Sequence, residues 1–125
     1  MIGEEGLARL AGARVAVFGL GGVGAACAEA LVRGGVGAFL FVDKDAVEPS
    51  NINRQAIAFA STVGRRKVDV MRAMALDINP EADIETLDAF VRRESIEALM
   101  EAVASPDCIV DALDTLTAKT ALALY

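Results

Sequence analysis

Four glycines near the start of the chain have a spacing that suits phosphate binding. Gly19, Gly21 and Gly24 form the pattern G-x-G-x-x-G, with Gly22 beside the second of them. The pattern lies between a predicted strand and a predicted helix. There, the first glycine permits a tight turn, the second lets a phosphate approach the backbone, and the third lets helix and strand pack closely. The N–H groups at the helix start can then face an anion, so the sequence predicts a nucleotide-binding loop.

Asp43 follows the second apolar run of the chain, 39–42. An acidic side chain at the end of that strand can accept hydrogen bonds from both ribose hydroxyls. NAD, FAD and ATP all carry such a ribose. The glycines and Asp43 therefore leave redox chemistry and adenylation equally open.

Three further motifs distinguish between these chemistries. They are Asp43-x-Asp45 with Ser50-Asn51-Ile52-Asn53-Arg54-Gln55, then Val63-Gly64-Arg65-Arg66-Lys67, and Asp111-Ala112-Leu113-Asp114. Together these motifs resemble the ThiF/MoeB/HesA family, relatives of ubiquitin-activating enzymes. The resemblance extends over the whole chain and implies that residues 1–125 are a partial ATP-binding adenylation domain.

The resemblance assigns roles by position in these motifs. Asp43 and Asp45 join the four glycines as nucleotide contacts, with Asp43 holding the ribose. Phosphate contacts are implied for three residues, and Mg²⁺ binding for one, with catalytic roles for Arg54, Lys67 and Asp114. The phosphate set is Asn51, Arg54 and Lys67, and the metal ligand is Asp114.

Each of these roles makes chemical sense for a carboxylate that attacks the α-phosphate of ATP. The anionic phosphate chain repels the attacking carboxylate, and arginine and lysine neutralise that charge in different ways. Mg²⁺ prefers one or two carboxylates together with phosphate oxygens and water. A plainer interpretation also exists for several residues. Asp45 can be a turn residue, Asp114 a helix cap, and Lys67 a solvated lysine on an exposed helix.

The acceptor substrate is suggested by finer similarities. Ile78-Asn79-Pro80, Asp88-Ala89-Phe90-Val91 and Ala118-Lys119 are similar to the tRNA threonylcarbamoyladenosine dehydratase branch, which cyclises a modified adenosine in tRNA. The alternative acceptor is the C-terminus of a ubiquitin-like sulfur carrier. Two other functions stay open: an NAD- or FAD-binding oxidoreductase half, which leaves Arg54 and Lys67 unexplained, and a nucleotide-binding module without catalysis.

The family pattern also implies segments that this sequence lacks, namely an arginine-bearing segment before Met1 and an acceptor-binding half after Tyr125. On that comparison we expect a truncated chain that binds ATP weakly and turns over little substrate alone. Family members are usually twofold dimers, so we expect a homodimer.

The elements that must position these residues alternate along the chain. Short apolar runs separated by helices predict an α/β, Rossmann-like fold with a mainly parallel sheet and helices on both faces. Ligands bind such sheets at the carboxyl ends of the strands, where the candidate residues fall. The predicted strands are 14–18, 39–42, 84–90 and 108–112, and the predicted helices are 22–33, 64–78, 95–103 and 115–125, with 45–60 irregular.

Composition excludes several other classes of protein. Histidine is absent, which removes the commonest general base and zinc ligand, and the net charge of −6 disfavours nucleic-acid binding by this segment alone. No apolar run approaches the ~20 residues of a membrane span, and no signal peptide is visible. Cys27 and Cys108 are predicted to be buried, reduced thiols, which favours a cytoplasmic protein.

Overall fold

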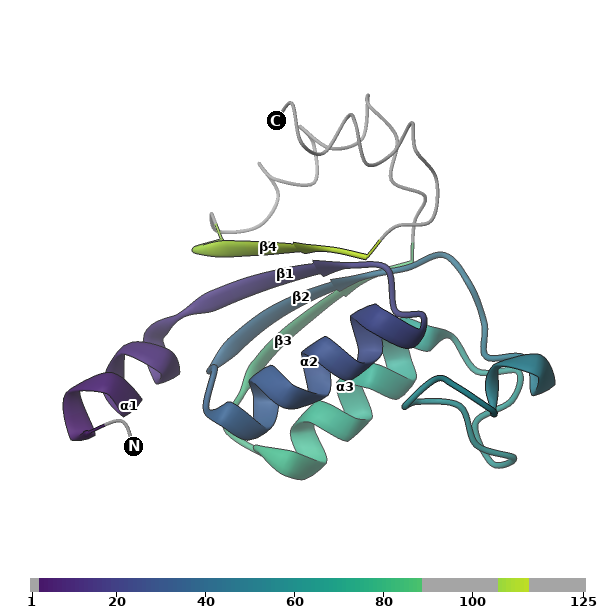
Figure 1. The fold of residues 1–125 in the computed structure, drawn as a ribbon, viewed down its shortest axis with the longest axis horizontal. Helices are drawn as coiled ribbons and strands as arrows, with labels where there is room; N and C mark the ends of the chain where they lie inside the picture. Colours follow the sequence, from purple (N-terminus) through teal and green to yellow (C-terminus); the bar gives the residue numbers. More distant parts are fainter. Residues whose placement is uncertain (1–2, 89–105, 113–125) are drawn as a thin grey trace, which may run out of the picture.

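The computed structural model describes residues 3–88 and 106–112, which form a parallel sheet with helices packed against it (Figure 1). Three α-helices and one 3₁₀ helix accompany four strands in these ranges. In chain order they are α1 (Glu4–Gly12), β1 (Arg14–Phe18), α2 (Gly22–Gly34), β2 (Ala38–Val42), η1 (Pro49–Asn51), α3 (Lys67–Ile78), β3 (Asp83–Leu87) and β4 (Cys108–Asp111).

The strand order is β3-β2-β1-β4, and all three pairings are parallel. The chain moves outward from β1 to β2 and β3, and β4 then pairs on the other side of β1. The point where the direction reverses lies between β1 and β4, and α/β sheets bind ligands at such a point. The predicted α/β fold with a parallel sheet is therefore confirmed.

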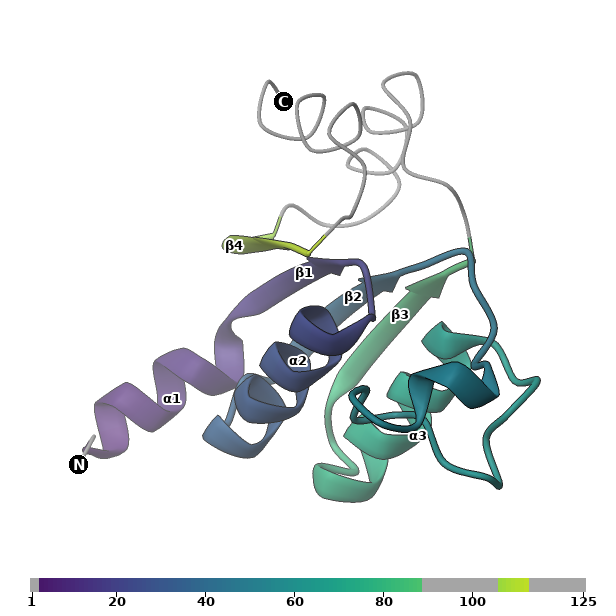
Figure 2. The ribbon, with the colours of Figure 1, turned by 45° about the vertical axis from the view of Figure 1, so that its right-hand side comes forward.

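Helix α2 connects β1 to β2, and α3 lies between β2 and β3 in the chain. These two helices lie side by side against one face of the sheet (Figure 2). Side chains alternate between the faces of a strand, so β1 and β2 each direct every second residue toward the helices. Phe39 and Phe41 stack in this layer with ring centroids 5.2 Å apart. The helices predicted over 95–103 and 115–125 lie outside the described residues.

The buried face of α2 differs from the expected one. The inward face was predicted from the apolar spacing of Val23, Cys27, Ala30 and Leu31. Leu31 does pack against the core and Cys27 is half-buried, but Val23 is 75% exposed and Ala30 is exposed as well. The buried residues are instead Gly24, Ala25, Ala28 and Val32. The cause is the close contact of Gly24 with the glycine loop, which turns the side of the helix with the smallest residues toward the sheet.

Helix α3 begins at Lys67, three residues after the predicted start. Gly64 has φ +89°, which is incompatible with an α-helix, and its N–H donates to the Val47 carbonyl over 2.8 Å. The residues before the helix are thus held by the loop that follows β2. The expected inward face is confirmed: Val68, Met71 and Ala75 are buried, and Met74 and Ile78 pack against the core.

Two predictions about the ends of the chain need correction. β4 was predicted to be a buried strand, but Cys108 and Ile109 are exposed, because within the described residues β4 pairs with β1 alone. Neither cysteine forms a disulfide, yet Cys27 is only half-buried and Cys108 is exposed, so the prediction of two buried thiols is wrong.

The sequence reasoning also missed α1, although acidic residues in its first turn are a helix-start signal. Within the described residues, no helix is long and apolar enough to cross a membrane.

Candidate functional site

The glycine loop connects β1 to α2 at the carboxyl end of the sheet. Gly19 has φ +94°, and its N–H donates to the Val42 carbonyl over 2.9 Å, which ties the loop to the end of β2. A Cβ on Gly24 would overlap the carbonyl oxygen of Gly19 and lie 3.1 Å from the Cβ of Ala112. Gly19 and Gly24 thus have the turn-forming and packing roles that their spacing predicted.

The N-terminus of α2 follows directly, with Gly21 as its N-cap residue. No side chain caps this helix, and the first intrahelical bond runs from the Ala25 N–H to the Gly21 carbonyl over 3.0 Å. The N–H groups of residues 22–24 precede that bond and so lack an intrahelical acceptor. Together with the helix dipole, they favour an anion at this end of the helix.

Asp43 is held between the glycine loop and the segment after β2. Its Oδ2 accepts the N–H of Leu20 over 2.7 Å, and its Oδ1 accepts the N–H of Asp45 over 2.8 Å. Both bonds fix the direction of the carboxylate at the end of the strand. A carboxylate oxygen has a second lone pair, so Asp43 can still accept hydrogen bonds from two ribose hydroxyls.

A short antiparallel bridge sets the position of Lys67. The Val47 N–H donates to the Arg65 carbonyl over 2.8 Å, and the Lys67 N–H donates to the Asp45 carbonyl over 3.0 Å. Asp45 thus positions Lys67 through its backbone, while its exposed carboxylate lies 3.7 Å from the Lys44 ammonium. These contacts bring the first residue of α3 beside the residues that follow β2.

Lys67 is buried, with only 6% of its surface exposed, so the plainer expectation of a solvated lysine is wrong. Across residues 3–88 and 106–112, no hydrogen bond or ion pair is found for its ammonium group. The Nζ atom is not fully covered, so the ammonium reaches solvent at the end of a buried carbon chain. An anionic ligand would provide the missing partner.

The segment after η1 lies against the glycine loop. A Cβ on Gly22 would be 3.6 Å from the Arg54 carbonyl oxygen. The Arg54 side chain is exposed, and its Nη1 donates to the carbonyl of Ser50 over 2.8 Å and to Oδ1 of Asn53 over 3.2 Å. A guanidinium has five N–H donors, so most of its donors are left for a ligand.

Asn51 is buried, with 7% of its surface exposed, and it has a structural role. Its Oδ1 accepts the N–H of Glu48 over 2.9 Å, and the Glu48 side chain accepts the N–H of Asn51 in return. This reciprocal pair closes the turn that carries Arg54. The amide nitrogen of Asn51 remains as a donor.

Gln55 is a polar residue of this region that the sequence reasoning did not assign. Its side chain is 8% exposed, and its Nε2 lies 3.8 Å from the position that a Cβ on Gly21 would take. Its Oε1 is fully covered and has no hydrogen-bond partner. The available signal was its place directly after Arg54 in the quoted motif.

Two aspartates belong to the last of the quoted motifs. Asp114, the predicted metal ligand, lies outside the described residues. Asp111 ends β4 opposite Phe18, at the carboxyl edge that carries the glycine loop. Among the described residues, no group of three histidine, cysteine, aspartate or glutamate side chains could hold a metal ion.

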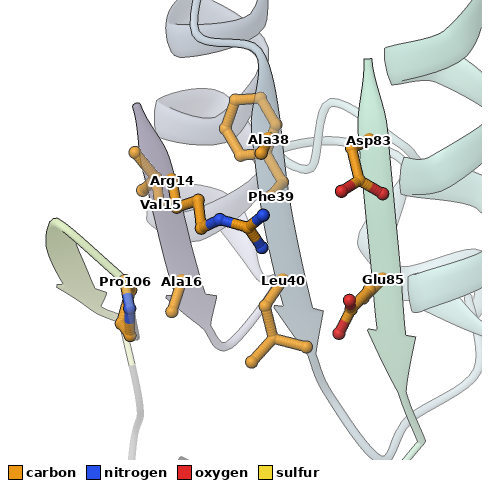
Figure 3. A pocket seen from close by; sticks show the side chains of 9 residues that line it. All are labelled: Arg14, Val15, Ala16, Ala38, Phe39, Leu40, Asp83, Glu85 and Pro106. Atoms are coloured by element: carbon orange, nitrogen blue, oxygen red, sulfur yellow. The ribbon is translucent and has the colours of Figure 1, made fainter. Parts of the chain in front are cut away.

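A pocket elsewhere on the sheet is separate from these residues (Figure 3). It is formed by the first residues of β1, β2 and β3, including Arg14, Ala38 and Asp83, together with Pro106. None of the candidate site residues lines it. The candidate residues gather at the opposite, carboxyl edge of the strands.

Comparison with known proteins finds a family and several relatives for this chain. Residues 1–125 match the model of the ThiF family. A tRNA threonylcarbamoyladenosine dehydratase from Bacillus subtilis is 48% identical over 118 residues, which are 94% of this chain and 46% of that protein. A SAMP-activating enzyme E1 from Haloferax volcanii is 38% identical over 113 residues, covering 90% of this chain and 41% of that protein.

The fold also matches solved structures. The crystal structure of tRNA N6-threonylcarbamoyladenosine dehydratase from E. coli in complex with ATP superposes with a TM-score of 0.92 at 38% identity. The match covers 96% of this chain and 49% of that one. The chain therefore spans slightly less than half the length of each of these three relatives.

Proposed function

Because the chain belongs to the ThiF family, we propose that it forms the ATP-binding part of an enzyme that adenylates a carboxylate. The observation that carries this proposal is Lys67, a buried residue whose ammonium has no counterion in the described residues. Its N–H donates to the carbonyl of Asp45, two residues after Asp43, whose carboxylate is fixed by the glycine loop. The match to a dehydratase solved in complex with ATP favours ATP over NAD as the anion that Lys67 meets.

The proposed reaction uses these residues to stabilise charge. A carboxylate oxygen of the acceptor attacks the α-phosphorus of ATP, the new P–O bond forms, and the bond to the bridging oxygen breaks to release pyrophosphate. Arg54 and Lys67 would neutralise negative charge on the phosphates, with the α2 N-terminus and Asn51 as further donors. Asp43 would hold the ribose, with Asp45 beside it. Catalysis is then mainly positioning and electrostatic stabilisation, without a protein nucleophile.

Mg²⁺ fits this scheme as a partner of the phosphates. A bound Mg²⁺ commonly uses one or two carboxylates, with phosphate oxygens and water as the other ligands, so a cluster of protein ligands is unnecessary. We assign the protein carboxylate to Asp114. The ion would reduce the negative charge of the phosphate chain.

The acceptor in this proposal is a threonylcarbamoyl-modified adenosine in tRNA. Support comes from the relative in Bacillus subtilis at 48% identity, a dehydratase of that modified nucleoside. The similarity to a SAMP-activating enzyme E1 at 38% identity favours a second candidate, the C-terminus of a ubiquitin-like protein. Both acceptors require the same adenylation step.

A cytoplasmic homodimer completes the proposal. Ile52, Phe59 and Val63 are 46%, 54% and 37% exposed on the loop between η1 and α3. Exposed apolar side chains of this size suit an interface, and a closed twofold dimer is the commonest assembly. Sedimentation of the chain as a monomer at micromolar concentration would contradict the dimer.

The nucleotide is tested by titration calorimetry with ATP, with and without Mg²⁺, and with NAD. We expect ATP to bind and NAD to bind at least tenfold more weakly. Equal or tighter binding of NAD would refute the proposal. Pyrophosphate exchange into ATP that depends on modified tRNA, and not on a ubiquitin-like protein, would establish the acceptor.

A further inference from the structure

The side chain of Gln55 is unlike the other buried polar groups of its loop. Thr62, which is also 8% exposed, has its hydroxyl both donating and accepting within the loop. It donates to the Ile57 carbonyl at 2.7 Å, contacts the Phe59 carbonyl at 3.1 Å and accepts the Phe59 N–H at 2.9 Å. For the Gln55 amide, no hydrogen bond is found in the described residues.

A buried amide without partners costs about as much as the hydrogen bonds that it lacks. Buried polar groups in proteins are nearly always paired, so each exception needs an explanation. A structural glutamine would connect two segments through its amide, and this one connects none among the described residues. The cost falls on the covered acceptor Oε1, while the Nε2 donors have no protein partner and stay available to a ligand.

The two ends of the Gln55 amide differ in their surroundings. Oε1 is fully covered, whereas Nε2 is not among the covered atoms and lies next to Gly21. Gly21 is the N-cap residue of α2, a 13-residue helix that no side chain caps. The N–H donors of the amide are therefore beside the N–H donors of the helix start.

We propose that the Gln55 side-chain amide is a further phosphate-binding group of this site, with Nε2 donating to a phosphate oxygen of the nucleotide. The inference rests on the proposed function, because the nucleotide is the source of the phosphate. Burial of the oxygen end holds the nitrogen end outward. Gln55 thus supplies a directed, neutral donor where Arg54 and Lys67 supply charge.

The experiment compares ATP with adenosine, which lacks phosphates, by competition binding to the wild-type chain and to variants. Gln55→Met removes the amide at similar size, and Gln55→Glu replaces the donor with a negative charge at the same shape. Thr62→Val is the matched control, because it removes buried hydrogen bonds from the same loop without changing a group beside Gly21.

We expect Gln55→Met to weaken ATP binding about tenfold, the effect of losing one hydrogen bond to a charged group, and adenosine binding less than twofold. Gln55→Glu should weaken ATP binding more than Gln55→Met, because it places a carboxylate against the phosphates. Thr62→Val should lower the melting temperature but leave the ratio of ATP to adenosine affinity unchanged. If Gln55→Met does not fold, Gln55→Glu decides the test by the same ratio.

Unchanged ATP affinity in folded Gln55 variants would overturn the inference while the wild-type chain still binds ATP. Equal weakening of ATP and adenosine would also overturn it, because that result indicates a structural role. Absence of ATP binding by the wild-type chain would instead refute the proposed function, and the inference with it.

Discussion

Replacing Lys67 with methionine should change the free chain and its ATP complex in opposite directions. The lysine side chain is 6% exposed, and its ammonium has no counterion among the described residues. Methionine keeps most of the buried apolar chain and removes the charge. The free protein should therefore become more stable, while the complex loses a cation that contacts phosphate.

The magnitudes follow from the partial desolvation of the charge. Removing an uncompensated charge from a mostly buried residue relieves part of its desolvation cost, and we expect a gain of about 1 kcal/mol. For a domain of this size, that gain raises the melting temperature by about 4 °C. A lost charge-assisted hydrogen bond costs roughly 1.5–3 kcal/mol, so ATP affinity should fall between about 10-fold and 150-fold.

The assay is thermal unfolding of the wild-type chain and the Lys67→Met variant, without ligand and across an ATP titration. Lys44→Met serves as the control, because Lys44 is a neighbouring lysine whose side chain is 45% exposed. It should change neither the melting temperature nor the ATP-induced shift appreciably. A Lys67→Met variant that melts lower than wild type yet keeps its full ATP shift would refute the reasoning.

Three further predictions concern the loop and its supports. In urea unfolding, Gly24→Ala should destabilise the chain by more than ~2 kcal/mol, and it should abolish ATP binding, because its Cβ would overlap the Gly19 carbonyl. The control Gly34→Ala, with open space around it, should be tolerated in the same assay. Asp43→Asn should cost ~1–3 kcal/mol by leaving an N–H donor unpaired; an unchanged urea midpoint would contradict this. Gly64→Ala should cost ~1–2 kcal/mol through backbone strain at φ +89°, and equal chemical stability would argue against that conformation.

Short sequence patterns predicted β1 and the end of α2 well, because neighbouring residues in the chain determine both features. A β-branched run that ends at glycine became β1, and the Gly34-Gly35 pair ended α2, with Gly35 at φ +109°. The start of α3 was placed too early because Gly64 is held by a bond to Val47, a residue of another segment. Periodicity carries no information about such a bond.

The face of α2 shows the same limit more clearly. A helix with alanine on several sides has no dominant apolar stripe, so Val23 and Cys27 predicted the wrong face. The close approach of Gly24 to Gly19 selected the actual face. That approach depends on the path of the glycine loop, which is a property of the folded chain.

The sequence by itself determined that a glycine loop, an acidic strand end and basic motifs occur in one chain, because residue types and spacing carry that information. It also indicated the parallel sheet, whose carboxyl edge collects these motifs. Only the tertiary structure decided that Lys67 is buried and that the Gln55 amide is unpaired beside Gly21. Burial and missing partners depend on all the segments that surround a side chain. The bridge between Ala46 and Arg66, which joins the loop after β2 to the start of α3, brings such segments together.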